Sequence, residues 1–381
     1  MRILLLSPYP PERDGIGTYA AALHGALAAD GHELGVIAAR RSERPLPETL
    51  AALPAAGRST DRALDAATAF VPDVVHVQFA IAAYGTLLPS LGRLVSRLRG
   101  RGVPIVVTMH EVTRDTASLP LAGAAIYRWV AGLADHVVVH TEAARRRLAD
   151  LLGSGRPPVS VIPHPRTALP GGAVTPAQLR SRLGLGHAPV VLAFGFLDVD
   201  KGLQDLIAAA GRIAQTGPAP DVRFVVAGEV RRRFGPFRAF ELRDRVYAWR
   251  LRRLARRLRL QRRVTFTGFV PADEVRAYFD MATIAVLPYR RSEQSGVASL
   301  ASAAGTPVLT TDVGELAALS TVPPVPPRDP AQLAERLTGF LAAPRPPRRG
   351  GAGRAAGGDL AEIAATTAAL YTDLVPTTTV V

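Results

Sequence analysis

Cysteine is absent from the 381-residue chain, and this absence removes several classes of chemistry at once. Disulfides, thiolate metal sites and cysteine nucleophiles are excluded, and the composition predicts a cytoplasmic protein. Lysine is almost absent as well: 45 of the 46 basic residues are arginine, and Lys201 is the exception. The one position at which arginine is not used is therefore worth examining.

Long apolar runs are also missing. No stretch reaches the length of about 18 apolar residues that a transmembrane helix needs. The short apolar run near the N-terminus ends in a proline-rich loop without a small-residue cleavage site, so we expect no signal peptide. The hydrophobic share of 48% is nevertheless ample for packed cores, and the length is typical of two domains.

Positive charge is concentrated in one segment. Residues 231–263 contain 14 arginines against Glu241 and Asp244, while the rest of the chain is close to neutral. Such a segment suits an anionic partner: a membrane surface, nucleic acid or an acidic substrate. We favour peripheral contact with the inner face of an anionic membrane over nucleic acid.

The same segment has two sets of apolar residues. Four of them recur at helical spacing and are predicted to pack on a sheet; they are Tyr247, Leu251, Leu254 and Leu258. Others are candidates for insertion into a lipid interface, namely Phe234, Phe237, Phe240 and Trp249.

Short apolar segments alternate with helical ones along the whole chain. The predicted strands cover 2–6, 32–39, 74–79, 104–110, 136–141 and 159–163 in the first half, and 189–197, 222–229, 264–269, 283–289 and 306–312 in the second half. Strands that are apolar on both faces and separated by helices indicate parallel sheets covered on both sides. The fold class is therefore α/β, with two Rossmann-like, doubly wound domains facing a cleft.

The limits of these domains follow from proline and glycine. Residues 164–176 break the alternation and read as a linker. We expect an N-terminal domain over 1–168, a C-terminal domain over 169–355, and a last helix with a frayed tail over 356–381. Ligands of doubly wound sheets bind at the carboxyl ends of the strands, so the loops there are the ones to search.

The loop after the first strand contains Gly15, Gly17 and Ala20 in a G-x-G-x-x-A pattern before a helix. Backbone N–H groups at such a helix start can hold a phosphate. Arg40 and Arg41, which end the second strand, could hold the extra phosphate of NADP, so an NADP-dependent oxidoreductase is one alternative.

Two loops of the second half carry further candidates. Lys201, after the first strand there, can contact a diphosphate as a compact cation. Residues 293–297 precede a small-residue helix, and the free amides at Ser295, Gly296 and Val297 would point at the same ligand. Asp198 and Asp200 form a D-x-D pair, but we predict no metal there.

His110 ends the fourth strand, where a polar side chain tends to face the ligand. On its own it could equally be a hydrogen-bonded core histidine. Other polar residues stand at similar strand ends, namely His76, Gln78, His140 and His164.

Taken together, these motifs resemble the GT-B glycosyltransferases of family 4, the group 1 retaining sugar transferases. The resemblance runs from residue 1 to about 320. Gly15 matches the second glycine of the family's Gly-Gly loop, and His110 matches its histidine near the donor sugar. Lys201 matches its diphosphate-binding lysine, residues 293–296 match its E-x-F-G motif, and Val270 falls beside the nucleobase.

The resemblance implies transfer of a sugar from a nucleoside-diphosphate sugar to a hydroxyl acceptor, with retention and without a metal or other cofactor. Lys201 and the amides at Gly15, Gly296 and Val297 would stabilise the departing diphosphate. His110 and Glu293 would position the sugar.

The chain departs from the family at two positions. Phe196 stands where the family has an arginine, and Ala301, or its neighbour Leu300, stands where it has a second glutamate; Ser302 is a candidate substitute. A weak or inactive relative, and a non-catalytic protein that binds anions through its arginines, therefore stay open as alternatives.

Overall fold

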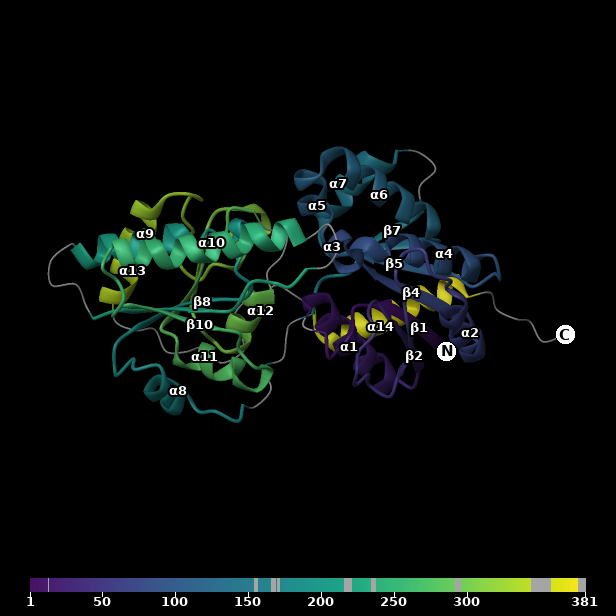
Figure 1. Cartoon of the computed structure of the whole chain (residues 1–381), viewed down its shortest axis with the longest axis horizontal. Helices are drawn as coiled ribbons and strands as arrows, with labels where there is room; N and C mark the ends of the chain where they lie inside the picture. Colours follow the sequence, from purple (N-terminus) through teal and green to yellow (C-terminus); the bar gives the residue numbers. More distant parts are fainter. Residues whose placement is uncertain are drawn as a thin grey trace. The chain divides into compact units, whose positions relative to one another are not determined.

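The computed structural model describes residues 1–12, 14–153, 157–165, 169, 172–215, 221–233, 238–291, 296–343 and 358–375. These residues form two compact units, each built around a parallel sheet (Figure 1). The first unit comprises Met1–Pro165 and helix α14 (Leu360–Leu374), and the second lies between them along the chain. The predicted domain limits at 168 and 355 fall outside the described residues.

The first sheet has seven parallel strands in the order β3-β2-β1-β4-β5-β6-β7. They are β1 (Arg2–Ser7), β2 (Glu33–Ala38), β3 (Thr49–Ala52), β4 (Val74–Phe79), β5 (Ile105–Met109), β6 (His136–Val139) and β7 (Val159–Val161). The strand order reverses between β1 and β4. Ligands of open α/β sheets bind at the carboxyl ends of the strands beside such a switch.

Strand β3 is the element of this sheet that the sequence pattern does not predict. It has four residues and lies at the sheet edge beside β2. Val36 donates its N–H to Glu48 at 2.9 Å, and Leu53 donates to Ala38 at 2.9 Å. A strand this short has no clear period of its own, because the backbone of β2 decides where it pairs.

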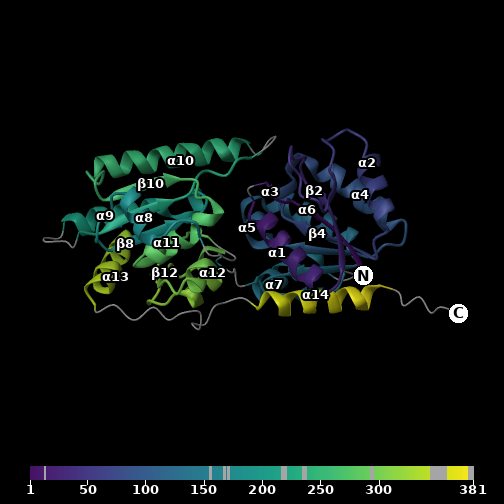
Figure 2. The same ribbon diagram turned by 90° about the horizontal axis from the view of Figure 1, so that it is seen from below.

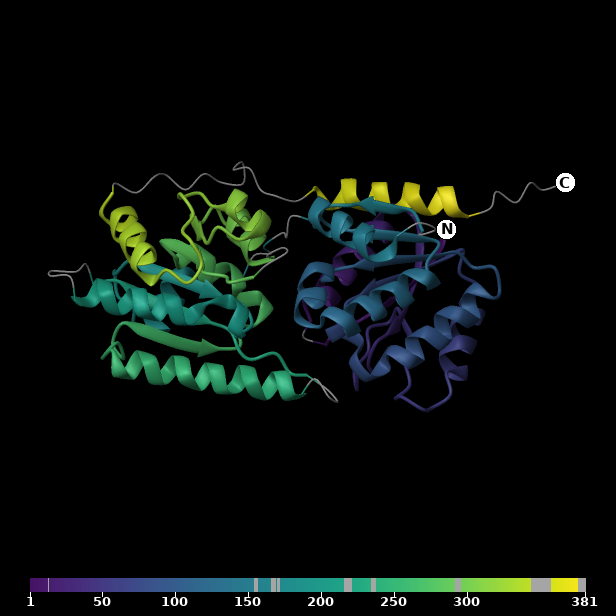
Figure 3. The ribbon, with the colours of Figure 1, turned by 90° about the horizontal axis from the view of Figure 1, so that it is seen from above.

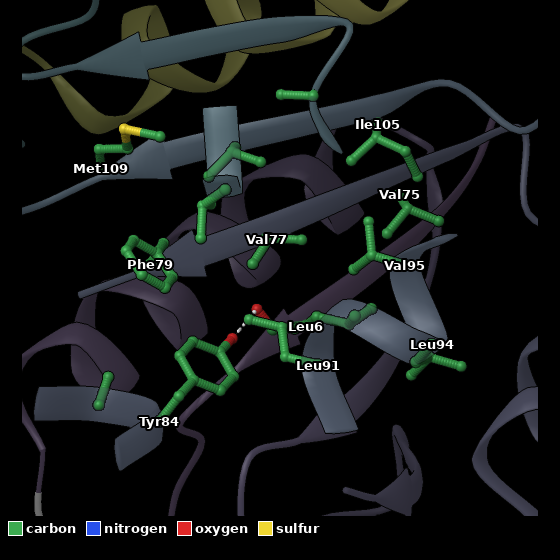
Figure 4. Packing of buried hydrophobic residues seen from close by; sticks show 14 of the residues in the cluster. Leu6, Val75, Val77, Phe79, Tyr84, Leu91, Leu94, Val95, Ile105 and Met109 are labelled. Atoms are coloured by element: carbon green, nitrogen blue, oxygen red, sulfur yellow. Dashed lines mark hydrogen bonds between the residues drawn. The ribbon is translucent and has the colours of Figure 1, made fainter. Parts of the chain in front are cut away.

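Helices cover both faces of the first sheet, so alternate residues of β1 enter different cores. Ile3 and Leu5 pack with α1 (Gly15–Ala29) and α14, which lie side by side (Figure 2). Leu4 and Leu6 pack on the opposite face, and Figure 4 shows Leu6 there. The helices of that face are α2 (Asp61–Phe70), α3 (Ile81–Tyr84), α4 (Leu88–Arg99), α5 (Val112–Ser118), α6 (Pro120–Leu133) and α7 (Glu142–Leu152).

One buried hydroxyl in this core has its partner in the sheet. Tyr84 is fully buried and donates its hydroxyl to the carbonyl of Leu6 at 2.8 Å (Figure 4). A buried phenol without such an acceptor would be costly. The bond ties α3 to the carboxyl end of β1, next to the loop that carries Gly15.

The second sheet has five parallel strands in the order β10-β9-β8-β11-β12. They are β8 (Val190–Phe194), β9 (Arg223–Ala227), β10 (Val264–Gly268), β11 (Ile284–Leu287) and β12 (Val308–Thr310), and the sequence predicts all five. Here the order reverses between β8 and β11. The loops that carry Lys201 and Gly296 follow these two strands, which puts both at the switch.

Two layers of helices cover this sheet as well. One face carries α9 (Leu203–Gln215), α10 (Arg238–Arg257) and α13 (Pro330–Ala342), and the other carries α8 (Pro176–Arg182), α11 (Val275–Met281) and α12 (Gly296–Ala303) (Figure 1). Tyr247 and Leu251 of α10 are buried against the sheet, and Leu254 and Leu258 are partly buried there, so the predicted packing stripe is confirmed. No helix among the described residues is long and apolar enough to span a bilayer.

Candidate active site

The loop after β1 ends in a cap for helix α1. The carboxylate of Asp14 accepts hydrogen bonds from the N–H of Ile16 at 2.8 Å and of Gly17 at 3.4 Å. A Cβ at Gly17 would lie 3.1 Å from the carbonyl oxygen of Pro8, whereas one at Gly15 would meet no described atom within 4 Å. Gly17 therefore serves the packing of the loop, and its role with a phosphate stays a prediction. Gly15 has room in front of it.

Arg40 is engaged within the same region. Its guanidinium forms an ion pair with Glu12, a residue of the loop after β1. The pair fixes the loop against the end of β2. It also neutralises the positive charge of Arg40, to which the extra phosphate of NADP would have to bind. The geometry of Arg40 thus gives no support to the oxidoreductase alternative.

His110 lies at the centre of a hydrogen-bonded chain of side chains. Its Nε2 lies 2.9 Å from Oε1 of Gln78, and its Nδ1 lies 3.1 Å from Nε2 of His140. Nδ1 of His140 donates to the carbonyl of Ile162 at 2.8 Å. The chain links the carboxyl ends of β4, β5 and β6 and fixes the orientation of the His110 ring.

Tyr19 of α1 completes a cluster of rings around this chain. Its ring centroid lies 5.1 Å from that of His110, 5.3 Å from that of His140 and 5.0 Å from that of His164. These are the separations of edge-to-face and tilted aromatic pairs. Tyr19 is buried, so it shields the imidazoles from water on the side of α1.

Burial and neighbouring imidazoles keep these histidines uncharged. Burial lowers the pKa of His140 to about 3 and the pKa of His76 to about 3. Burial, followed by repulsion from His140, lowers the pKa of His110 well below its usual range, and burial also lowers the pKa of His164. All four rings are therefore neutral at pH 7.

A proton count constrains the chain further. The chain has three hydrogen bonds: His110 with Gln78, His110 with His140, and His140 with the carbonyl of Ile162. The oxygens of Gln78 and Ile162 only accept, so the two rings would have to carry three N–H protons. Two neutral imidazoles carry two. With both rings neutral, the third proton has to come from Gln78, which requires its amide nitrogen to face His110. Gln78 then sets the tautomer of His110.

Helix α14 reaches the same region through His76. Nδ1 of His76 lies 2.6 Å from the hydroxyl of Tyr371, and its Nε2 lies 2.7 Å from the hydroxyl of Thr108. Helix α14, the last helix among the described residues, therefore packs against the histidine cluster through Tyr371. Its contribution to the first unit is a buried hydrogen bond as well as apolar contacts.

In the second unit, Lys201 is held over an aromatic ring. Its Nζ lies 3.7 Å from the ring centroid of Tyr289, a buried residue that follows β11. Gly202, the next residue, has a φ of +61°, and a Cβ there would lie 1.9 Å from the carbonyl oxygen of Pro288. The close approach of these two loops requires glycine at 202 and brings the ammonium to Tyr289.

The loops after β8 and β9 also run together. Gly195 donates its N–H to Ala227 and Leu197 donates to Glu229, both at 2.9 Å. This pairing sets the guanidinium of Arg231 over the ring of Phe196, 5.5 Å from its centroid. Phe196 lines the same small pocket as Lys201, so two cations flank the carboxyl end of β8.

Helix α12 begins at the same edge. Its first residues are Gly296 and Val297, and their amides are among those that have no partner within the helix. A Cβ at Gly195 would lie 3.3 Å from a methyl group of Val297, so the loop after β8 and the start of α12 are in contact. Glu293 and Ser295 lie outside the described residues, and their roles stay predictions.

Other predicted residues have mainly structural surroundings. Val270 is 7% exposed and packs in the core, and its place beside a nucleobase stays a prediction. Ala301 is fully buried, and a carboxylate at that position would be buried with it. Asp198 accepts a hydrogen bond from the N–H of Asp200 at 3.0 Å and caps the short turn before Lys201. Among the described residues no three carboxylates or imidazoles are arranged to hold a metal ion.

Three contributors escape sequence reasoning: Tyr19, Arg231 and Tyr289. Each acts through a partner that is distant in the sequence, and each is of a residue type that is common in packed cores or on surfaces. Tyr289 directly follows Pro288 at a strand end, which is the one local signal that could have pointed to it.

Comparison with known proteins gives a consistent result. Residues 13–166 match the family described as Glycosyltransferase Family 4, and residues 188–343 match Glycosyl transferases group 1. The chain is 27% identical to glycogen synthase of Mycobacterium tuberculosis over 92% of this chain and 88% of the relative. It is 29% identical to a GDP-mannose-dependent phosphatidylinositol monomannoside mannosyltransferase of Mycolicibacterium smegmatis over 81% and 79%.

Solved structures show the same architecture. Sucrose-phosphate synthase from Thermosynechococcus elongatus superposes with a TM-score of 0.75 at 23% identity, over 98% of this chain and 99% of the other. Anabaena HepE in complex with UDP and glucose superposes with a TM-score of 0.66 at 18% identity, over 98% and 95%. The two family matches, the relatives and the paired parallel sheets together show that this chain is a GT-B glycosyltransferase of family 4 that uses a nucleotide sugar.

Proposed function

We propose that this enzyme transfers a hexosyl group from a nucleoside-diphosphate sugar to a hydroxyl acceptor with retention of configuration at the anomeric carbon. The observation that carries the proposal is the convergence of Lys201 with the start of α12 at the switch between β8 and β11. Cations and helix amides gathered at one point suit a diphosphate leaving group. Retention is what the family resemblance implies.

The proposed roles at the donor concern the negative charge of the departing diphosphate. When the glycosidic bond to the β-phosphate breaks, negative charge grows on the diphosphate. The ammonium of Lys201 and the amides of Gly296 and Val297 stabilise that charge, because they are already oriented before the reaction begins. Gly15, Glu293, Ser295 and Val270 keep the roles that the resemblance gives them.

Arg231 supplies a second cation in this proposal. Position 196 has phenylalanine instead of arginine, and the guanidinium over its ring comes from the next loop. The aromatic face holds the guanidinium by cation–π attraction and keeps its positive charge beside the carboxyl end of β8, where it would act on phosphate oxygens. The missing arginine would thus be replaced in space by a residue 35 positions later in the sequence.

Replacing Arg231 with methionine is expected to weaken the binding of a nucleoside diphosphate about tenfold, the loss of one charge-assisted contact. Isothermal titration calorimetry with UDP and GDP measures this. Arg232→Met is the matched control, since Arg232 is the adjacent exposed arginine and its loss should leave affinity unchanged. Equal effects of the two changes would mean that only the overall charge matters.

His110 is proposed to position the donor sugar. Both of its ring nitrogens already have partners in the first unit, Gln78 and His140. A sugar hydroxyl that binds this ring therefore takes the place of one of these two partners. In its neutral state the imidazole donates from one nitrogen and accepts at the other, which suits a hydroxyl.

The acceptor is proposed as a hydroxyl compound without further definition. The names of the relatives include glycogen, 2-deoxystreptamine, inositol 3-phosphate and a phosphatidylinositol mannoside, which have hydroxyl groups in common. Independence of metals, a cytoplasmic location and peripheral contact with an anionic membrane through residues 231–263 stay predictions.

The experiment that tests the reaction is a donor screen followed by product analysis. The protein is incubated with UDP-, GDP- and ADP-sugars and a set of hydroxyl acceptors, and nucleoside diphosphate release is measured. The anomeric configuration of the product is then determined by proton NMR. We expect the configuration of the donor to be retained; an inverted product would refute retention, and release by none of the donors would refute the transferase proposal.

A further inference from the structure

Helix α10 has an apolar stripe on its outer face in addition to the one that packs on the sheet. Leu242 is 63% exposed, Val246 is 39% exposed and Trp249 is 54% exposed. Their spacing of four and three residues puts them on one side of the helix. Figures 2 and 3 show α10 on the outside of the second sheet, so this side faces away from the core. Of the four aromatic residues that the sequence proposes for a lipid interface, Trp249 is on this stripe and Phe240 is not, while Phe234 and Phe237 lie outside the described residues. Leu242 and Val246 are not among them.

Exposed arginines border the stripe on both sides. A helical repeat of 3.6 residues puts Arg238, Arg245 and Arg256 on one side, Arg250 and Arg257 on the other, and Arg253 next to Trp249. The guanidinium of Arg253 lies 5.3 Å from the centroid of the Trp249 ring. The stripe and its arginines form one surface, which we name the α10 outer face.

The acidic residues of α10 neutralise only Arg245 among the arginines of this face. Asp244 is 1% exposed and binds Arg243 at 2.9 Å and Arg233 at 3.5 Å on the inner side. Glu241 pairs with Arg245 at 2.7 Å and also accepts the N–H of Arg233. Both carboxylates are therefore satisfied close to the helix, and the remaining arginines give the face a strong positive charge.

Charge and apolar content together select the partner. A second copy of the α10 outer face would be repelled, because both faces are positively charged. Nucleic acid would bind the arginines but would have no use for the exposed leucine and valine. An anionic lipid surface uses both, because side chains such as leucine and tryptophan enter the headgroup region while arginines contact phosphates. We infer that the α10 outer face docks the enzyme onto an anionic lipid bilayer.

This docking has a consequence for the acceptor. Helix α10 follows β9 and so begins at the carboxyl edge of the second sheet, the edge that carries Lys201. A helix that lies in the headgroup layer brings this edge close to the lipid surface. A hydroxyl acceptor carried by a lipid or delivered at the membrane is then favoured, a point that rests on the proposed function; the docking itself does not.

The test is co-sedimentation of the full-length protein with vesicles of phosphatidylcholine alone and of phosphatidylcholine mixed with phosphatidylglycerol in equal parts. We expect binding to the mixed vesicles only. The double change Leu242→Ser and Trp249→Ser should weaken that binding by about tenfold or more. Leu121→Ser, at an exposed leucine of the first unit, is the matched control and should bind like the wild type.

Tryptophan fluorescence reports the same contact independently. The chain has two tryptophans, so in a Trp129→Phe background Trp249 is the sole reporter. Its emission should shift to shorter wavelength when mixed vesicles are added, as the indole enters the interface. The inference is overturned if the protein ignores both kinds of vesicle, or if binding survives the double change and Trp249 shows no shift. Binding to nucleic acid at equal strength, again without that shift, would also overturn it.

The outcome is separable from that of the proposed reaction. The Leu242→Ser and Trp249→Ser variant is expected to bind UDP or GDP as the wild type does, because neither residue is part of the candidate diphosphate site around Lys201 and Gly296. Loss of vesicle binding with intact nucleotide binding supports the docking surface alone. Vesicle binding by a protein that turns over no sugar nucleotide would leave the docking in place and refute the reaction.

Discussion

Changing Lys201 to methionine is expected to lower kcat/KM for sugar transfer by about 100- to 1,000-fold, the usual cost of removing one group that stabilises developing negative charge. Methionine keeps the length of the side chain and its contact with Tyr289 but removes the cation. The loss should be mainly in kcat, because the diphosphate is most negative as it departs. Steady-state kinetics with the donor found in the screen measures it.

Two variants make this result specific. Lys201→Arg keeps the charge but replaces a compact ammonium with a planar guanidinium, so we expect partial recovery. Arg232→Met removes an exposed charge nearby and should have little effect. If Lys201→Met retains wild-type turnover, the donor diphosphate binds elsewhere and the second unit's role must be reassigned.

The rarity of lysine offers a direct measurement of binding. Reductive methylation with carbon-13 labels only Lys201 and the amino terminus, since the chain has no other lysine. The dimethyl-lysine signal should shift when UDP or GDP is added, with a titration curve that matches calorimetry. A signal that does not respond to a nucleotide that binds by calorimetry would place the diphosphate away from Lys201.

The first unit is expected to lose stability steeply as the pH falls below about 6.5. An unfolded histidine has a pKa of 6.5, whereas burial holds the pKa of His76 and His140 at about 3. The unfolded state therefore binds protons first on acidification. The stability from these two neutral rings is fully present above pH 6.5 and is lost progressively from there toward pH 3.

The expected magnitude is large for a single unit. At pH 5 each of the two rings costs about 2 kcal/mol of unfolding free energy, against a total of about 5–15 kcal/mol for a typical protein. His76 meets Tyr371, Thr108 and Gln78, and His140 meets His110, Ile162, Tyr19 and His164. Asp115 of the same unit opposes part of the loss, because burial raises the pKa of its carboxyl to about 7.

Unfolding of a chain with two units need not be two-state, so the measurement should report on the first unit. Hydrogen exchange of peptides from β1, β4 and β5 at a series of pH values provides this. His76→Gln should reduce the pH dependence, and His187→Gln, at an exposed position of the second unit, is the control. Imidazole NMR signals of His76 and His140 that titrate near pH 6.5 in the folded protein would contradict the prediction.

Features with local sequence signals were predictable. The five strands of the second sheet are apolar runs bounded by loops, and each forms where the pattern predicts it. Thr175 followed by Pro176 signals a helix start, and the structure shows a capping box there with Gln178. The stripe from Tyr247 to Leu258 packs inward because a repeat of 3.6 residues aligns it.

The candidate site was predictable only in part. Lys201, Gly296 and His110 stand at strand ends or helix starts, so their positions follow from the order of elements. The partners that orient them do not. Tyr289 lies under Lys201, and Gln78 and His140 hold His110, because strands that are distant in sequence are adjacent in the sheet.

The sequence by itself therefore determined the two doubly wound sheets, the family and the candidate loops at the carboxyl ends of the strands, because these depend on local periodicity and on the order of motifs along the chain. Only the tertiary structure decided that β3 joins the first sheet, that Arg231 lies over Phe196, and that α10 has a second apolar stripe facing outward. The physical reason is that pairing, stacking and exposure depend on which residues meet across the fold, and a one-dimensional pattern contains no record of those contacts.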